Sequence, residues 1–294
     1  MTEAVRRLSL LLLVAVALLV PTRAPAAPRA VRLVTSFYPV YLATQNVTRG
    51  IPGVTVENLT QPLTGCLHDY QMTTQDLRHL SGADAFVVNG VGMESFLDKV
   101  VAQLPRLPVV DAGRGIEPLR HEGTQGVNPH VWLSVSLHIR QVQNIAFELG
   151  QIDRARAAAY AANAAAYVSR LQALRQKMQE GLRTLRTREI ITFHEAFPYF
   201  ARDFGLRIAA VIEREPGSQP SARELADLVA IVRRAKVKAL FVEPQYPSKG
   251  AQTLARETGA GVYTLDPVVT GPADPDAYLR IMEQNLAELQ RALR

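Results

Sequence analysis

Three histidines stand in stiff, apolar surroundings that suit metal ligands. His68 lies in Gly-Cys-Leu-His-Asp-Tyr, His130 in Asn-Pro-His-Val-Trp-Leu and His194 in Thr-Phe-His-Glu-Ala-Phe. Neutral imidazole is the commonest nitrogen ligand of Zn²⁺, and a carboxylate often completes a four-coordinate site. Asp266, which ends an apolar run, is the carboxylate that we expect in this role. Each residue alone is weak evidence, but their shared setting, past an apolar run or beside a proline, favours one common ion.

Two other residues are alternatives as ligands. Cys66 stands two residues before His68, and a thiolate is a good ligand of Zn²⁺, although we favour a thiol that packs within its loop. Glu243 also closes an apolar run, so it is either a direct ligand or a hydrogen-bond partner of a ligand histidine. The remaining histidines are interpreted as solvated or structural: His79, His121 and His138.

The first half of the chain alternates between strands and helices. Strands are expected at 30–35, 54–59, 85–88 and 108–110, with helices to 48, from 73 or 74 to 80, and at 93–104. This alternation is typical of a mostly parallel sheet covered by helices. Ligands of such sheets bind outside the carboxyl ends of the strands, which suits the loop of His68.

The second half repeats the alternation after two helices. One helix is expected at 134–149, ended by Gly150, and a long one runs from a cap at Asp153 to about 185, roughly 50 Å in length. Strands follow at 189–193, 207–212, 239–242 and 262–265, with helices at 198–204, 221–234 and 250–258 and a closing helix capped by Asp274. The sequence therefore predicts two similar α/β lobes with a long connecting helix.

The N-terminus has the pattern of a secretory signal peptide. Arg6 and Arg7 precede an apolar run of about 13 residues, which is too short to span a bilayer core of ~30 Å. Ala24-Pro25-Ala26 offers a cleavage site after Ala26 or Ala27, and a membrane anchor is the less favoured alternative. Because no cysteine ends the run, we expect a free periplasmic protein. The expected division is 1–26 signal peptide, 27–152 first lobe, 153–187 linking helix and 188–294 second lobe.

Charge argues against nucleic acid as a partner, and the cysteine content shows what must stabilise the fold. Cleavage after Ala26 removes three arginines and one glutamate, so the formal charge falls from +6 to +4. This mild basicity, without a Lys/Arg block, does not indicate nucleic acid as a partner. The single cysteine cannot form an intramolecular disulfide, so an apolar core must hold the exported protein together.

Seven ordered segments resemble the metal-binding family of ABC-transporter substrate-binding proteins, which deliver zinc or manganese. The segments are VTSFYP (34–39), HDY (68–70), NGVGME (89–94), NPHVWL (128–133), FHEAFPY (193–199), EP (243–244) and TLDP (264–267). The resemblance implies two α/β lobes joined by one long rigid helix, with the metal in the cleft between them. It also implies His68, His130, His194 and Asp266 as the ligands, an ABC-transporter membrane permease as the partner, and a monomer.

Zinc is the expected ion, with manganese as the alternative. Relatives that select manganese tend to have a glutamate at the position of His194, and three nitrogen ligands favour Zn²⁺ over Mn²⁺. A secreted zinc hydrolase is a rival class, but Pro198 stands where a His-Glu-x-x-His motif needs its second histidine. A surface adhesin or a metal-storage protein is a third class, which no repeat or low-complexity segment supports. We therefore expect a binding protein and no enzyme.

Overall fold

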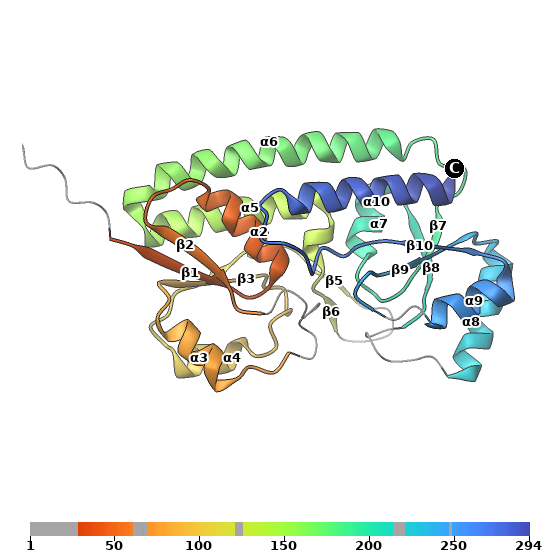
Figure 1. Cartoon of the computed structure of the whole chain (residues 1–294), viewed down its shortest axis with the longest axis horizontal. Coiled ribbons are helices and arrows are strands. Elements are labelled where there is room, and N and C mark those ends of the chain that lie inside the picture. Colours follow the sequence, from red (N-terminus) through yellow and green to blue (C-terminus); the bar gives the residue numbers. More distant parts are fainter. Residues whose placement is uncertain (1–28, 61–66, 68–69, 121–125, 214–220, 247–248) are drawn as a thin grey trace, which may run out of the picture.

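The computed structural model describes residues 29–60, 67, 70–120, 126–213, 221–246 and 249–294. Two sheets lie side by side, and the helix α6 (Ala157–Gly181) runs along both of them (Figure 1). Its 25 residues give a length of about 38 Å. The architecture confirms the prediction of two α/β lobes with a long helix between them.

The first lobe is built on a parallel sheet of four strands in the order β2-β1-β3-β4. Its strands are β1 (Val31–Thr35), β2 (Val54–Asn58), β3 (Ala85–Val88) and β4 (Val109–Asp111). Its helices are α2 (Tyr38–Thr48), α3 (Thr74–Ser81) and α4 (Leu97–Gln103). All four residues of β3 are buried, because this apolar strand lies inside the sheet with helices near it.

The second lobe repeats this topology in the order β10-β9-β7-β8. Its strands are β7 (Glu189–Thr192), β8 (Arg207–Val211), β9 (Ala239–Val242) and β10 (Gly261–Thr264). Its helices are α7 (Pro198–Phe204), α8 (Ala222–Ala235), α9 (Lys249–Thr258) and α10 (Ala277–Leu293). In each lobe the first strand pairs in parallel with the second strand on one side and with the third strand on the other. The strand order therefore reverses between the first and the third strand.

The middle of the chain connects the lobes. A short antiparallel ribbon, β5 (Leu119–Arg120) with β6 (Val127–Asn128), leads through the 3₁₀ turn η1 (Val131–Leu133) into α5 (Val135–Ile152). A second 3₁₀ turn, η2 (Arg154–Arg156), leads into α6. The buried residues of α6 recur every three or four positions: Tyr160, Ala164, Tyr167, Leu171, Leu174 and Met178. This stripe lets α6 pack against α5 and α2 of one lobe and α10 of the other.

Several predicted helix starts and ends were wrong. The helix expected from 93 begins at Leu97, because the Glu94 carboxylate turns back to accept from the backbone N–H groups of Asn89 and Gly90. Gly150 does not end α5, which continues to Ile152. Asp274 does not cap α10; its carboxylate accepts from the N–H of Asp276, and the helix begins at Ala277, two residues after the start that a cap at Asp274 predicts.

The long helix is shorter than the predicted stretch from 153 to about 185. Asp153 does not cap it, because Oδ2 of Asp153 accepts hydrogen bonds from Arg156 and the hydroxyl of Tyr160 at 2.8 and 2.9 Å. The chain makes one 3₁₀ turn before α6 begins, and α6 ends at Gly181 instead of about 185. Within the described ranges, no helix is long and apolar enough to cross a bilayer.

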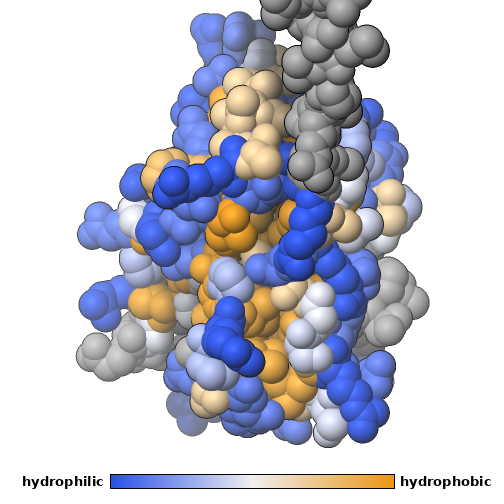
Figure 2. Space-filling model, turned by 90° about the vertical axis from the view of Figure 1, so that its left-hand side faces the viewer, coloured by the Kyte–Doolittle hydropathy of each residue, from blue (hydrophilic) through white to orange (hydrophobic). Residues whose placement is uncertain are grey.

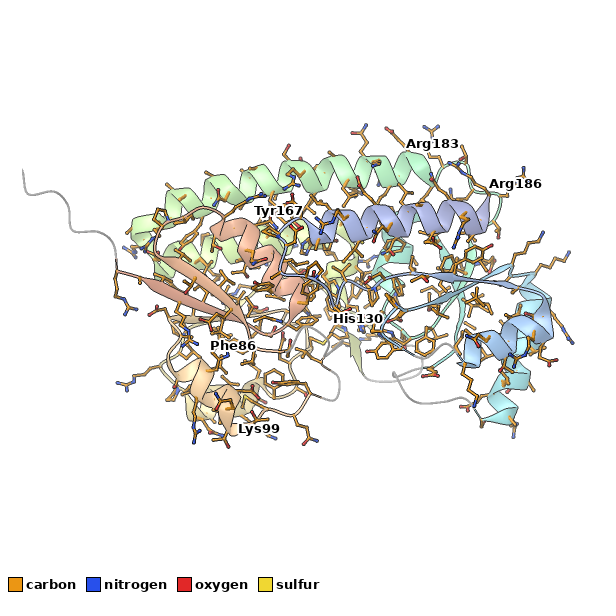
Figure 3. All side chains as sticks on the ribbon, viewed as in Figure 1. Phe86, Lys99, His130, Tyr167, Arg183 and Arg186 are labelled. Atoms are coloured by element: carbon orange, nitrogen blue, oxygen red, sulfur yellow. The ribbon has the colours of Figure 1, made fainter. Side chains whose placement is uncertain are left out.

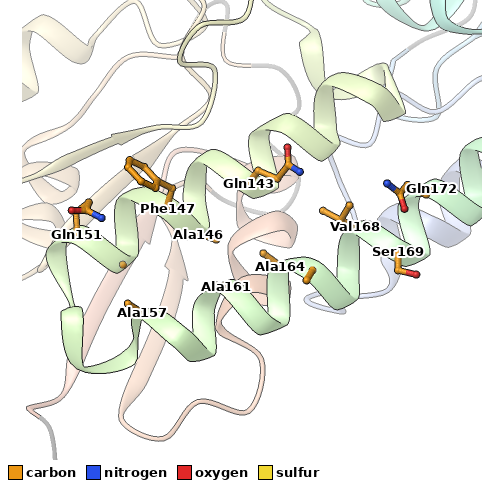
Figure 4. A pocket seen from close by; sticks show the side chains of 12 residues that line it. Gln143, Ala146, Phe147, Gln151, Ala157, Ala161, Ala164, Val168, Ser169 and Gln172 are labelled. Atoms are coloured by element: carbon orange, nitrogen blue, oxygen red, sulfur yellow. The ribbon is translucent and has the colours of Figure 1, made fainter.

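The described part of the surface is hollowed in places away from the lobe junction. A groove of about 530 Å³ lies between α5 and α6, where its lining includes Ala146, Phe147 and Ala161 (Figure 4). The outer end of the first lobe carries apolar side chains in the middle of a hydrophilic surround (Figure 2), and Val31 and Ile152 line a smaller hollow in this lobe. The groove is lined without histidine, cysteine or carboxylate, so it is not a metal site.

Candidate metal centre

The candidate ligands follow strands that end at the junction of the lobes. His194 comes two residues after β7 and Glu243 directly after β9, and these two parallel strands pair with each other at the switch point of the second sheet. Asp266 comes two residues after β10. His130 is supplied from the other side, between β6 and η1, and Figure 3 shows it between the lobes. The fold thus brings residues far apart in sequence to one place.

His130 and His194 face each other through their Nε2 atoms, which are 3.4 Å apart. Both residues are buried, each with 1% of its surface exposed. Two nitrogen ligands of a tetrahedral Zn²⁺, each at 2.0–2.1 Å from the metal, are separated by about 3.3–3.4 Å. The separation of the two nitrogens therefore matches a pair that shares one zinc ion.

The other ring nitrogen of His130 is held by Asn128. Oδ1 of Asn128 lies 2.9 Å from Nδ1 of His130 and also accepts from the backbone N–H of His130 at 3.0 Å. The amide orientation follows from the opposite end, because Nδ2 of Asn128 donates to the carbonyl of Glu195 at 2.7 Å. Nδ1 of His130 is therefore the donor, and Nε2 keeps its lone pair for a metal.

The other ring nitrogen of His194 is held by Glu243. Nδ1 of His194 hydrogen-bonds to Oε1 of Glu243, and the second carboxylate oxygen accepts from Nε2 of Gln245 at 3.0 Å. Glu243 has 2% of its surface exposed. A carboxylate that binds the outer nitrogen of a ligand histidine fixes the tautomer of the ring and raises its basicity. Glu243 was expected to be either a direct ligand or a hydrogen-bond partner of a ligand histidine. The structure contains the hydrogen bond of the second role.

Asp266 lies partly buried at the same junction. Its Oδ1 accepts from the N–H of Val268 at 2.7 Å. Burial raises the pKa of Asp266 to about 6; the Val268 hydrogen bond opposes this shift, and the nearby charge of Glu243 adds to it. Over the part of the chain that the structure describes, no three histidine, cysteine or carboxylate side chains form a group able to hold a metal. His68 and Cys66 lie outside the described residues.

The other histidines occupy separate places. His79 of α3 pairs with Glu57 of β2, with 2.7 Å between Nε2 and Oε2. His138 of α5 is buried with 1% exposure and stacks on Tyr278 of α10, with ring centroids 4.1 Å apart. Burial lowers the pKa of His138 to about 4. His121 falls outside the described ranges. The two that are described have structural contacts, as interpreted from the sequence.

Two supporting residues were missed in the sequence. Asn128 holds His130, and an Asn two residues before the histidine is a recognisable signal, because Asn side chains bond to the backbone two residues on. Trp132, the single tryptophan, was not predicted to have a role at the site. Its Nε1 donates to the carbonyl of Pro267 at 2.8 Å, which joins the loops of His130 and Asp266. Nothing in the sequence signals that second contact.

Comparison with known proteins places the chain in a family and finds relatives of similar sequence. The sequence model of the family described as "Zinc-uptake complex component A periplasmic" (ZnuA) matches residues 33–292. The high-affinity zinc uptake system protein ZnuA of Bacillus subtilis is 30% identical over 282 residues, which cover 89% of this chain and 87% of that protein. The zinc-binding lipoprotein AdcA of Streptococcus pneumoniae TIGR4 is 29% identical over 280 residues, 88% of this chain. The matched part is 55% of AdcA, so the chain spans about half the length of that relative.

Solved structures share the whole fold. A crystal structure of ZnuA superposes with a TM-score of 0.80 at 33% identity and covers 90% of this chain and 99% of that one. The substrate-binding protein FpvC of Pseudomonas aeruginosa in complex with Ni²⁺ has a TM-score of 0.80 at 32% identity, over 90% of this chain and 97% of FpvC. FpvC has also been solved with Mn²⁺.

Proposed function

The chain belongs to the zinc-uptake complex component A family of periplasmic proteins, and we propose that it captures a divalent metal ion for import by an ABC transporter. The ion is zinc, bound at the junction of the lobes and then delivered to a membrane permease. The observation that carries this proposal is the facing pair of Nε2 atoms in His130 and His194, 3.4 Å apart. The family is one of transport proteins, so we propose no catalytic step.

The proposed ligands are His130 and His194 through Nε2, together with His68 and Asp266. Glu243 acts as the hydrogen-bond partner of His194, because its Oε1 contacts Nδ1 of that ring. Three imidazoles and one carboxylate form a closed four-coordinate site, which leaves no metal-bound water to activate. Cys66 remains the alternative ligand beside His68.

Zinc is favoured over manganese by the nitrogen ligands. Imidazole suits Zn²⁺, whereas Mn²⁺ prefers carboxylate, carbonyl and water oxygens. The Ni²⁺ and Mn²⁺ complexes of FpvC are complexes of a relative with the same fold, so selectivity must be measured on this protein.

Export and division of the chain complete the proposal. We propose that 1–26 is a signal peptide removed near Ala26 and that the mature protein works free in the periplasm. The proposed lobes are 27–152 and 188–294, with 153–187 as the linking segment around α6. The mature protein acts as a monomer with its permease.

The experiment is a calorimetric titration of metal-stripped protein with Zn²⁺ and with Mn²⁺. We expect Zn²⁺ to bind with a Kd below micromolar and more tightly than Mn²⁺. Loss of a residue that only hydrogen-bonds to a metal ligand weakens binding roughly 10–100-fold. His130→Ala and His194→Ala each remove a proposed ligand, so they should weaken zinc binding by more than this. His79→Ala is the matched control, because His79 also pairs with a carboxylate but on α3, and its zinc affinity should equal that of the wild type. Binding of neither ion below micromolar, or a His130→Ala variant with unchanged affinity, contradicts the proposal.

A further inference from the structure

A buried row of hydrogen bonds runs from α5 to the residue before His130. Nδ1 of His138 lies 3.3 Å from Oε1 of Gln141, and Nε2 of Gln141 donates to Oδ1 of Asn89 at 2.8 Å. Nδ2 of Asn89 then donates to two backbone carbonyls, those of Pro129 and Gly90, at 3.0 and 2.9 Å. The exposures of Asn89, His138 and Gln141 are 0%, 1% and 2%, so water does not compete for these bonds. From His138 to Pro129, each side chain donates to the next residue of the row.

Asn89 itself is anchored to the first sheet. It directly follows β3, and its backbone N–H donates to Oε1 of Glu94 at 2.7 Å. The same carboxylate accepts from the hydroxyl of Ser36 at 2.7 Å and from the N–H of Gly90 at 3.1 Å. Ser36 follows β1, so the Asn89 side chain projects from a fixed point at the carboxyl end of two neighbouring strands.

The acceptor of Asn89 belongs to the peptide group that carries His130. A peptide group is a rigid plane, so holding its oxygen and its N–H fixes its orientation. Asn89 holds the oxygen of the plane between Pro129 and His130, and Asn128 holds its N–H at 3.0 Å. The same oxygen also accepts from the N–H of Val131 at 2.8 Å. This plane and the turn that the Val131 contact closes across His130 together set the direction in which the His130 side chain leaves the backbone.

We infer that Asn89, held in turn by Gln141, is a positioning residue for His130 and sets the metal affinity without touching the metal. It keeps Nε2 of His130 facing His194 in the metal-free protein, so the ion does not have to order this loop when it binds. This inference rests on the proposed function, because it concerns the same site.

The test is a titration of the metal-free protein with Co²⁺, whose visible absorption reports the ligand geometry of a zinc site. Asn89→Ala removes both the donor to Pro129 and the acceptor for Gln141. Asn89→Asp keeps the acceptor and the volume but has no N–H for Pro129. In both variants we expect the Co²⁺ affinity to fall by roughly 10–100-fold, as for other outer partners of ligands, with an altered absorption spectrum.

The matched control is Asn46→Ala. Asn46 of α2 has 3% exposure and also donates to two backbone carbonyls, those of Leu42 and Pro275, at 2.9 and 2.7 Å. We expect a similar loss of stability in urea but the wild-type Co²⁺ affinity and spectrum. If Asn89→Ala does not fold, Gln141→Leu replaces it, with a smaller fall in affinity in the same direction.

Each outcome decides a different statement. Asn89→Asp with wild-type affinity and spectrum overturns the positioning role, as does an Asn46→Ala variant that loses as much affinity as Asn89→Ala. Wild-type protein that binds neither Co²⁺ nor Zn²⁺ overturns the proposed function instead.

Discussion

Each imidazole of the facing pair uses Nδ1 for a hydrogen bond to the protein, and its Nε2 faces the other ring. The partners differ in charge: Asn128 gives His130 a neutral acceptor, whereas Glu243 gives His194 a carboxylate. A carboxylate partner makes the opposite nitrogen more basic, so His194 should be the stronger donor to a metal. Both partners are buried at the site, with exposures of 1% for Asn128 and 2% for Glu243.

Replacement of Glu243 tests its role as a partner. We expect Glu243→Ala to weaken zinc binding roughly 10–100-fold and Glu243→Gln to weaken it less, because glutamine still offers an oxygen to Nδ1 of His194. Calorimetry with Zn²⁺ measures both. Glu57→Gln is the control, since Glu57 pairs with His79 on the surface of the first lobe, and its affinity should not change. A Glu243→Gln variant as weak as His194→Ala would indicate that Glu243 is itself a ligand.

Trp132 provides an intrinsic probe of the site. It is the single tryptophan, it is fully buried, and its ring centroid lies 5.2 Å from that of His130. A divalent ion bound to His130 places charge beside the indole, so its emission intensity or wavelength should change on zinc binding. Fluorescence titration of the metal-free protein measures this change, and His130→Ala should abolish it. An emission that stays constant while calorimetry reports saturation would rule out the placement of the ion on His130.

Short-range signals explain what could be predicted among the elements. The buried strands β3 and β9 were predicted with the right bounds, because a short apolar run between polar residues has few other interpretations. The capping box of Ser221 with Glu224 likewise marks the start of α8. The start of α4 was missed because Glu94 binds the strand end behind it instead of opening a helix.

For the site, as for the helices and strands, short-range signals in the sequence could be interpreted, whereas contacts between distant residues could not. The four candidates could be chosen from their local setting, past a strand or beside a proline. That Nε2 of His130 meets Nε2 of His194 depends on contacts between residues 64 positions apart. The hydrogen bond from Asn128 to the carbonyl of Glu195 joins residues 67 positions apart. Such contacts result from the packing of the lobes, which no spacing in the sequence encodes.

The loop between β3 and α4 needs glycine at position 90. Gly90 has a φ of +73°, and a Cβ there would lie 1.9 Å from Oδ1 of Asp111, which also accepts from the N–H of Gly113. Gly259 has nearly the same φ, +74°, but open space around it. We expect Gly259→Ala to lower the free energy of unfolding by about 1–2 kcal/mol from the backbone alone, and Gly90→Ala by about 1–3 kcal/mol more. Urea unfolding compares them; equal losses would mean that Asp111 moves aside freely.

Glu94 makes the stability of the same loop depend on pH. Burial raises its pKa from 4.5 to about 7, and the hydrogen bonds from Ser36, Asn89 and Gly90 oppose this rise by lowering the pKa. Because the folded pKa is above the unfolded one, the contribution of Glu94 is fully present below about pH 4.5 and is lost as pH rises through 7. This loss is on the order of 3 kcal/mol at pH 8.

Glu94→Gln removes this titration. The free energy of unfolding of the variant, minus that of the wild type, should increase from pH 5 to pH 8 in urea measurements on metal-free protein. Asp276→Asn is the control, because Arg170 lowers the pKa of Asp276 below its ordinary 3.8, and its difference should stay flat over this range. A flat difference for Glu94→Gln would show that the carboxyl group keeps one charge state throughout.

The two lobes share a large apolar cluster, and the second lobe has a further cluster of its own around Ile191, Leu228 and Leu254. The shared cluster of buried side chains includes Leu33 of β1, Leu171 of α6, Phe241 of β9 and Leu289 of α10. Polar contacts cross the same junction: the hydroxyl of Tyr38 donates to the carbonyl of Pro272 at 2.8 Å, and that of Tyr278 donates to the carbonyl of Trp132 at 2.8 Å. Unfolding of one lobe therefore also exposes the side chains that the other lobe contributes to the shared cluster.

We therefore predict one cooperative unfolding transition and a single response to zinc. In urea, the emission of Trp132 at the junction and the far-ultraviolet circular dichroism of both lobes should give the same midpoint, because the largest apolar cluster is built from both lobes. Zinc bound only by the folded protein adds RT ln(1 + [Zn²⁺]/Kd), about 2.7 kcal/mol at 100 times Kd, and should move both midpoints together. In His130→Ala the transition should remain single but lose most of the shift with zinc. Two separated midpoints, or a zinc shift in only one signal, would mean that the lobes unfold independently and that the metal stabilises only one of them.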